Sequence, residues 1–338
     1  MQVKIVEEVG KDKSNKKDKN KYIFLQQFVN KKIKNVREIN VKKNDIIFLD
    51  KDNNVKSYHT YNDLIKYYNN IPNNANKALL INKFSYFFSL HDEYSMNKCE
   101  IEILSKITKD YKLLFEKLEL IYDRIELEGV INDKLIVGLG NHSVHETSIT
   151  LHGTYGIPYI PSSAIKGVLR NYLIKEYYNV IFTDNNGNHK DDSCESQLLT
   201  TIFGGKNKDG KNVKGKVIFM DIFPTSFCIK KDIITPHHSN YYRENENDVL
   251  PLDTDEPKPI EFLILQNNDD KECKFNFNLL VDKSISRLKI GDIEENEKLN
   301  VYKDYYLYDF IEKNIKDAIE LNGLGAKTSV GYGYFNIK

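Results

Sequence analysis

The sequence contains little of what several common protein classes require. Its four cysteines, Cys99, Cys194, Cys228 and Cys273, include no CxxC pair, so they predict reduced, mostly buried thiols rather than a zinc knuckle or a thioredoxin-like site. No apolar run reaches the roughly 18 residues of a transmembrane helix. Residues 1–30 lack the apolar core and cleavage site of a secretory signal. We therefore expect a cytoplasmic protein without a membrane partner.

Net charge is also absent, because 49 Lys and Arg balance 49 Asp and Glu among the 338 residues. This average excludes a uniformly basic nucleic-acid coat and an acidic disordered tail. The charge is uneven, however: residues 1–60 hold 15 basic and 8 acidic side chains, and residues 11–43 hold 12 and 3. A field of one sign attracts phosphate backbones. A solvated, partly disordered arm explains the stretch equally well.

The order of the predicted elements indicates an α+β fold over residues 131–338, preceded by a basic, mainly helical N-terminal region, residues 1–130. Apolar periodicity predicts helices at 162–178 and 304–321. It predicts strands at 135–139, 217–222, 260–265, 275–281 and 330–337. Polar stretches predict inserted loops at 183–215 and 240–259, the first interrupted by a short helix at 198–203.

Without its loops, the second region has the strand and helix order of a ferredoxin-like (RRM-like) fold. In this fold two helices cover one face of an antiparallel sheet. We expect the other face to stay open for a ligand. RNA-binding modules often use this architecture, although a fold alone does not establish a function.

The most informative segment is GLGAKTSVGYGYF near the C-terminus. It holds Gly323, Gly325, Gly331 and Gly333 between a predicted helix and a predicted strand. Glycine permits positive φ and close backbone approach, exposed amides can form a concave anion site, and Lys327 adds positive charge. Dinucleotide-binding and Walker A loops lie between a strand and a following helix, so both are excluded. A helix C-cap followed by strand glycines is the structural alternative.

The segment IPSSAIKGVLRNYL contains a second candidate site. Ser162 and Ser163 follow Pro161 and open a helix, which leaves free amides at the positive end of the helix dipole. Lys166 and Arg170 are four residues apart and share one helix face. The pattern predicts a site for backbone phosphates. An ordinary amphipathic helix with solvated cations is the alternative.

Histidines form the third candidate set. His142, His145 and His152 lie in one polar segment, and His237 in TPHHSNYY is followed by Tyr241. No spacing matches HExxH, so we predict no metal site and no cofactor. Imidazole and phenol rings can instead stack on splayed bases or bond phosphates and 2′-hydroxyls. Packing within polar loops is the commonest fate of such residues.

Five segments occur in an order that resembles one family. They are GLG-x(4)-HE-x(5)-H-x-x-YGIPYIP leading into IKGVLR, then FGG, GKVIFMDIFP, TPHHSNYY and GLGAKTSVGYGYF. The sequence resembles the RAMP superfamily of type III CRISPR systems, over about residues 135–338. The TPHH-x-x-YY segment points within it to the family of sixth Cmr subunits of the type III-B effector.

The resemblance implies a structural RNA-binding subunit rather than an enzyme. Such a subunit holds the 3′ part of the guide RNA at the end of the filament and supports target RNA binding. Its partners would be guide RNA, target RNA, the backbone RAMP subunit, the first Cmr subunit and the small subunit. The predicted RNA contacts are Ser162, Ser163, Lys166, Arg170, His145, His237, Tyr241, Gly323, Gly325, Lys327, Gly331 and Gly333.

Catalysis is not expected of this chain. In such complexes an aspartate of the repeated backbone subunit cleaves the target, so the resemblance implies no catalytic role for Asp221, which we expect to make a structural hydrogen bond from a strand. Ser162 departs from the glycine that relatives commonly carry. The alternative function is a metal-independent endoribonuclease that processes precursor guide RNA, with His145, His237 or His238 as acid–base residues.

Overall fold

The computed structural model divides the chain into two compact units: residues 1–75 with 79–90, and residues 76–78 with 91–338. It describes residues 2–5, 46–49, 55–59, 76–79, 81, 93–141, 147–178, 180–181, 190–191, 196–206, 210–235, 257, 259–267 and 272–338. In the described part of the first unit, three antiparallel strands form a sheet in the order β1-β2-β3: β1 (Gln2–Ile5), β2 (Ile46–Leu49) and β3 (Val55–His59). The division between residues 130 and 131 stays a prediction.

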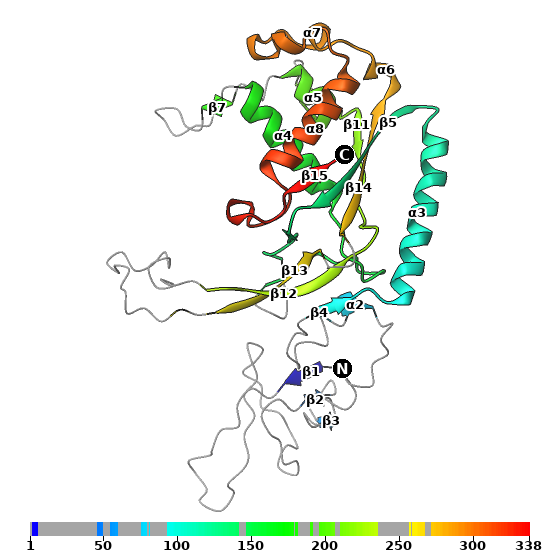
Figure 1. The fold of residues 1–338 in the computed structure, drawn as a ribbon, viewed down its shortest axis with the longest axis vertical. Coiled ribbons are helices and arrows are strands. Elements are labelled where there is room, and N and C mark those ends of the chain that lie inside the picture. Colours follow the sequence, from blue (N-terminus) through cyan, green and yellow to red (C-terminus); the bar gives the residue numbers. More distant parts are fainter. Residues whose placement is uncertain are drawn as a thin grey trace, which may run out of the picture. The chain divides into compact units, whose positions relative to one another are not determined.

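A four-stranded antiparallel sheet forms the centre of the second unit (Figure 1). Its order is β11-β14-β5-β15, built from β5 (Tyr122–Ile131), β11 (Val217–Phe219), β14 (Lys274–Asp282) and β15 (Phe335–Ile337). Helix α4 (Ser162–Tyr177) lies in the chain between β5 and β11, and α8 (Leu307–Asn322) between β14 and β15. This is the ferredoxin-like order, so the predicted α+β class is confirmed.

One face of this sheet is apolar because side chains alternate along its two central strands. Ile125 and Leu127 of β5 lie opposite Leu279 and Phe277 of β14, and all four are buried. Helices α4 and α8 pack together on this face. Their core residues recur at helical spacing, as expected for an amphipathic helix: Ile165, Leu169 and Leu173 in α4, and Ile311, Ile315 and Ile319 in α8.

The opposite face is partly covered, whereas we expected it to stay open. Helix α3 (Lys98–Leu118) lies along it, on the far side of β5 and β14 from α4 and α8 (Figure 1). The guanidinium of Arg124 on β5 lies 4.1 Å from the ring centroid of Phe115 on α3. Between helix and sheet remains a half-open cleft of about 270 Å³. The expectation was wrong because it left α3 outside the sheet domain.

A second antiparallel sheet adjoins the first. Its order is β4-β12-β13-β6, with β4 (Glu93–Ser95), β12 (Cys228–Ile234), β13 (Ile260–Gln266) and β6 (Lys134–Leu135). The strand predicted at 135–139 was therefore wrongly placed as the first ferredoxin-like strand. That strand is β5, whereas the predicted stretch forms only the end of the short β6, which pairs with β13 at the edge of the second sheet. Gly138, with φ of 81°, lies inside the predicted strand but beyond the end of β6.

The remaining described elements are short. The predicted loop at 183–215 contains α5 and a β9–β10 hairpin. The predicted last strand, 330–337, is shorter in the structure, because residues 328–330 form a 3-10 helix and β15 begins only at Phe335. None of the helices among the described residues is both long and apolar enough to cross a bilayer. The short elements are α2 (Lys77–Leu79), β7 (Val180–Ile181), β8 (Lys190–Asp191), α5 (Gln197–Phe203), β9 (Gly204–Lys206), β10 (Asn212–Lys214), α6 (Lys283–Ser286), α7 (Ile290–Ile293), η5 (Glu297–Tyr302) and η6 (Thr328–Val330).

Candidate nucleic-acid interface

The first turn of α4 is held by a carboxylate from a distant segment. The backbone N–H of Ser162 donates to Oδ1 of Asp221 at 2.7 Å. The structural hydrogen bond expected of Asp221 is thus confirmed, although the residue follows β11 rather than lying within it. Because Asp221 accepts this amide and places a negative charge at the helix start, Ser162 does not offer the free amide that the sequence indicated.

The outer face of α4 carries exposed cations around a glycine. Ser163, Lys166, Gly167 and Arg170 are all exposed. The ammonium of Lys166 also donates to the carbonyl of Phe203 at 2.8 Å, so it helps to end α5. A Cβ added at Gly167 would have no neighbouring atom within 4 Å. Packing within the chain therefore does not require glycine here, and the surface is open to another molecule.

The C-terminal glycine loop is folded tightly against its own chain. Gly323, Gly325, Gly331 and Gly333 all have positive φ. A Cβ at Gly325 would lie 2.2 Å from the carbonyl oxygen of Ile136, and one at Gly333 would lie 1.9 Å from that of Leu324. No side chain fits at either position.

The amides of this loop are largely used inside the chain. The N–H of Leu324 donates to the carbonyl of Gly333 at 2.7 Å, and that of Ala326 to the carbonyl of Ile136 at 2.8 Å. These glycines therefore fit the structural alternative, in which they cap the end of α8 and form a compact loop. Gly331 differs, because it is exposed at the loop tip and a Cβ added there would meet no atom within 4 Å.

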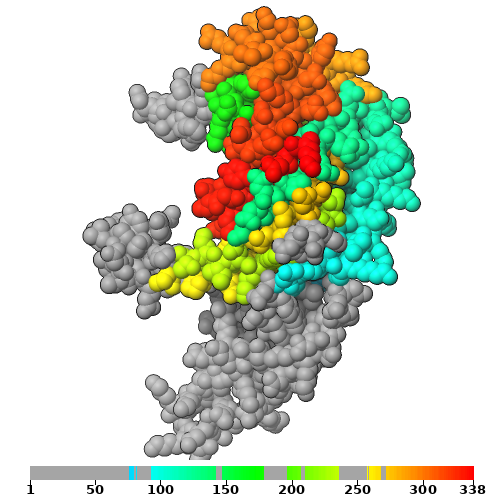
Figure 2. Space-filling view, viewed as in Figure 1, coloured from blue at the N-terminus to red at the C-terminus, as the bar shows by residue number. Residues whose placement is uncertain are grey.

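A charged cluster joins this loop to the second sheet. Oδ2 of Asp232 on β12 accepts from the ammonium of Lys134 and from the hydroxyl of Tyr332, each at 2.8 Å. Burial raises the pKa of Asp232, but the hydrogen bonds from Lys134 and Tyr332 outweigh it and lower the pKa below its ordinary value. Nζ of Lys327 lies 5.4 Å from the ring centroid of Phe262 on β13. In Figure 2 the loop (red) lies beside the sheet of β12 (yellow-green) and β13 (yellow).

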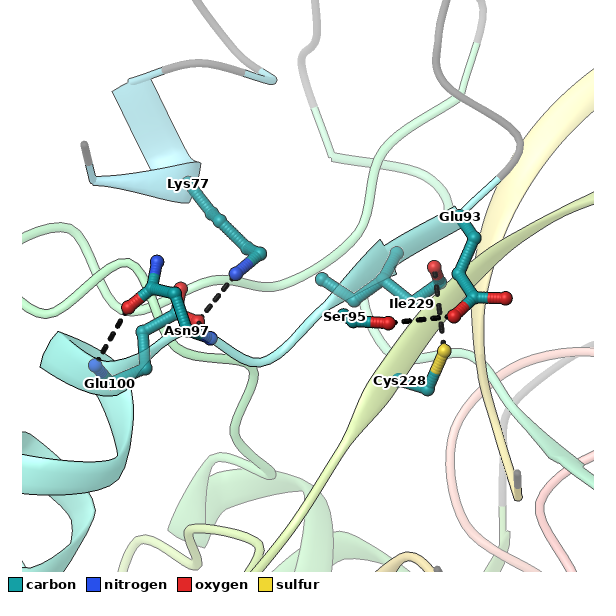
Figure 3. Close-up of polar contacts among 7 residues, drawn as sticks. All are labelled: Lys77, Glu93, Ser95, Asn97, Glu100, Cys228 and Ile229. Carbon is teal, nitrogen blue, oxygen red and sulfur yellow. Dashed lines mark hydrogen bonds and ion pairs between the residues drawn. The ribbon is translucent and has the colours of Figure 1, made fainter. Parts of the chain in front are cut away.

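The start of α3 is fixed by a buried ion pair (Figure 3). Asn97 and Glu100 form a capping box in which each side chain accepts the other's backbone N–H, both at 2.9 Å. The Glu100 carboxylate also pairs with the ammonium of Lys77, and both side chains are buried. The neighbouring Asn76 donates to the carbonyls of Gly153 and Thr154 at 3.2 and 2.9 Å. One short segment thus anchors both α3 and the turn before α4.

An aromatic cluster in this region was missed by the sequence reasoning. It consists of His152, Tyr155 and Tyr159 from the turn before α4, and Phe223 from the segment after β11. The three aromatic residues within HGTYGIPY were the available signal. Phe223 could not be assigned to the cluster from sequence, because only the fold brings it to that turn.

The predicted contacts at His145, His237 and Tyr241 lie outside the described residues, as does the alternative acid–base residue His238. The other predicted contacts fall on two elements, the face of α4 and the C-terminal loop. Their contact with RNA stays a prediction. Across the residues that the structure describes, no group of three or more His, Cys, Asp or Glu could hold a metal ion.

The architecture is that of an α+β protein of the ferredoxin-like class, closed by a glycine-rich loop. The chain belongs to the RAMP superfamily, whose family model matches residues 130–336.

Three curated proteins are similar in sequence. The CRISPR system Cmr subunit Cmr6 of Pyrococcus furiosus is 27% identical over 288 residues, covering 69% of this chain and 72% of that protein. Cmr6 of Saccharolobus solfataricus is 25% identical over 296 residues, covering 84% and 83%. The Csm3 endoribonuclease of Streptococcus thermophilus is 28% identical over 180 residues, covering 52% and 67%.

Proposed function

We propose that this protein is the Cmr6 subunit of a type III-B CRISPR effector complex in the cytoplasm, and that it binds RNA without cleaving it. The observation that carries the proposal is its similarity to two Cmr6 subunits over most of both chains. In this role it holds the 3′ part of the guide RNA at the end of the filament and supports target RNA binding. Its protein partners are the backbone RAMP subunit, the first Cmr subunit and the small subunit.

The outer face of α4 supports an RNA-binding role. Lys166 and Arg170 present two exposed cations one helical turn apart, with the bare backbone of Gly167 between them. Guanidinium and ammonium groups bind phosphates, and a glycine lets a sugar–phosphate backbone come close. Contacts of this kind position a strand without reading its sequence. That property suits a subunit that must accept guides of any sequence.

The C-terminal loop supports the same role at its tip. Ser329 and Gly331 are exposed, while the base of the loop is fixed by the close backbone contacts of Gly325 and Gly333. Lys327 brings a cation to this loop beside β13. A loop that is already rigid loses little conformational entropy when it binds a ligand.

The interactions of Asp221 support a structural role for this residue rather than a catalytic one. Its carboxylate accepts the Ser162 amide, and its carbonyl accepts the hydroxyl of Tyr111 at 3.1 Å. The carboxylate of Asp221 thus caps α4, which is a structural role. The similarity to the Csm3 endoribonuclease keeps an endoribonuclease as the second candidate.

The deciding experiment is purification of the tagged protein from its host, with sequencing of bound RNA and identification of bound proteins. Guide RNAs recovered together with several RAMP-type subunits and a large polymerase-like subunit are the expected result. In parallel, the isolated protein is incubated with repeat RNA. Specific products that disappear in His237→Ala, with no partner subunits recovered, would replace the proposal by the processing nuclease.

A further inference from the structure

Four aromatic rings pack into one unit immediately before α4. His152 and Tyr155 stack with 4.4 Å between ring centroids and 17° between ring planes. Tyr159 and Phe223 stack at 5.7 Å and 22°. The Phe223 ring joins the two stacks, at 5.7 Å from His152 and 6.2 Å from Tyr155. We call these four residues the aromatic platform.

The platform is accessible to solvent. Tyr155 exposes 37% of its surface, and His152, Tyr159 and Phe223 are each partly exposed. Aromatic rings gain free energy when they are buried, so a contiguous exposed group of them marks a binding surface more often than four scattered rings would. One face of the Tyr155 ring is stacked on His152. A further ring can therefore stack on Tyr155 only at its opposite face.

The turn that carries Tyr155 is held by several hydrogen bonds. The N–H of Gly156 donates to the carbonyl of His152 at 2.7 Å, and the N–H of Tyr155 donates to Nδ1 of His152 at 3.3 Å. Asn76 bonds the carbonyls of Gly153 and Thr154 from outside the turn. Because the ring is already positioned, a stacking ligand does not bear the cost of ordering it.

The surroundings of the platform suit a nucleotide. Tyr159 is followed within three residues by Ser162, the first residue of α4, whose outer face carries Lys166 and Arg170. Phe223 also lines the half-open cleft beneath α3, together with Tyr111, Asn276 and Asn278. Asn278 is buried and already bonded to Arg124 and to the carbonyl of Asn276, whereas Asn276 is partly exposed. The cations of α4 can bond phosphates. Phe223 thus links the platform to a polar cleft, and Tyr159 leads in sequence into the helix that carries the two cations.

We propose that the aromatic platform binds one unstacked nucleobase of an RNA strand, on the face of Tyr155 that is not stacked on His152. This inference rests on the proposed function, since it assumes that the subunit holds RNA. Base–aromatic stacking tolerates every base because each base has a π-face. A guide-binding subunit needs that tolerance, and hydrogen-bond readout of a base would not provide it.

Binding of a short fluorescein-labelled single-stranded RNA to the full-length protein, measured by fluorescence anisotropy, tests the platform. Tyr155→Ala is expected to weaken binding roughly ten-fold, as for loss of one stacked base. Tyr155→Phe keeps the ring and is expected to bind like the unmodified protein. Tyr306→Ala is the matched control, because Tyr306 is 46% exposed and lies at the start of α8. The loss in Tyr155→Ala should vanish on an abasic RNA of equal length.

The outcomes separate the platform from the proposed function. RNA bound equally well by the unmodified protein and Tyr155→Ala overturns the platform and leaves the proposed function standing. Loss of a protein subunit from the Tyr155→Ala complex with unchanged RNA affinity also overturns it. If Tyr155→Ala does not fold, ultraviolet crosslinking of bromouridine RNA to the unmodified protein replaces it. A crosslink to the peptide containing Tyr155 supports the platform, and crosslinks only elsewhere overturn it.

Discussion

The backbone N–H of Ser162 donates to the carboxylate of Asp221 across 59 positions of sequence, at 2.7 Å. This bond fixes the first turn of α4 to the segment that follows β11, and so sets the orientation of the helix face with Lys166 and Arg170. Replacing the carboxylate should therefore loosen the helix start. It should not abolish a chemical step.

For Asp221→Ala we expect the free energy of unfolding to fall by about 1–2 kcal/mol, the usual cost of a lost cap or charged hydrogen bond. Asp221→Asn retains an acceptor oxygen and should cost less. Urea denaturation of both variants measures the effect, with Asp110→Asn on the exposed side of α3 as control. Abolished target cleavage by complexes assembled with stably folded Asp221→Asn would contradict the non-catalytic role.

The glycine loop offers a matched pair of substitutions. Gly333→Ala places a Cβ 1.9 Å from the carbonyl oxygen of Leu324, whereas Gly331→Ala meets nothing within 4 Å, and both residues have positive φ. We expect Gly331→Ala to cost about 1 kcal/mol for its backbone conformation. Gly333→Ala should cost clearly more, because the backbone itself must move. Equal midpoints in urea denaturation would show that the close approach does not hold the loop.

Gly167 provides the opposite case. Glycine within a helix costs roughly 0.5–1 kcal/mol relative to alanine, and nothing in the chain opposes a Cβ at this position. Gly167→Ala should therefore raise the stability of the free protein by that amount. If an RNA backbone approaches α4 here, the same change should weaken guide retention in the assembled complex. Asn171→Ala, an exposed position on the same helix, is the control.

The cluster of Lys134, Asp232 and Tyr332 should make stability depend on pH in the acidic range. The pKa of Asp232 is lowered from 3.8 in the folded protein, since the hydrogen bonds of Lys134 and Tyr332 outweigh the effect of burial. A lowered carboxyl pKa stabilises the folded state above the unfolded pKa, and this stabilisation is lost as pH falls through the folded value. We expect Asp232→Asn to cost about 1–2 kcal/mol near neutral pH.

This cost should remain constant from neutral pH down to about pH 5. It should shrink as the pH falls below about 4, where the unfolded chain takes up a proton on Asp232, and on through the lower folded-state pKa. Denaturation curves of both proteins across this range provide the measurement. Asp304→Asn, at a side chain that is 71% exposed, is the control. A difference between the two proteins that grows as the pH falls would show that Asp232 is destabilised by its surroundings.

Local patterns predicted those parts of the fold that depend on neighbours in sequence. The spacing of Ile165 and Leu169 was enough to find α4, and that of Ile311 and Ile315 was enough to find α8. Strand β5 was missed although its residues alternate, because a second apolar stretch near Leu135 resembled a strand more strongly. Such a choice is decided by pairing with β14 and β13, which a single segment does not encode.

The candidate site was predictable to a similar extent. The positive φ values of Gly323 and Gly325 follow from the type of residue and its place after a helix. That a Cβ at Gly325 would meet the carbonyl of Ile136, and that Phe223 joins the ring of Tyr155, depend on tertiary contacts between distant segments. Local patterns thus found the glycines and cations, whereas the aromatic platform required the fold.

The face of α4 makes the sharpest prediction for RNA. Each cation that neutralises a phosphate releases counterions, so its removal lowers affinity and makes binding less dependent on salt. In the purified complex, Lys166→Ala with Arg170→Ala should reduce guide retention and lower the slope of log affinity against log salt by about 1 for each lost phosphate contact. Lys166→Ala also removes the bond to the Phe203 carbonyl, so thermal unfolding must be compared first.

Lys298→Ala with Lys303→Ala, at exposed positions around η5, is the matched control for loss of charge. Tyr155→Ala should differ from the α4 variant in kind, because a stacked base contributes affinity without releasing counterions. Its salt slope should equal that of the unmodified protein while its affinity falls. An unchanged slope and unchanged RNA occupancy in the stably folded α4 double variant would remove α4 from the RNA path, and the C-terminal loop would be the next surface to test.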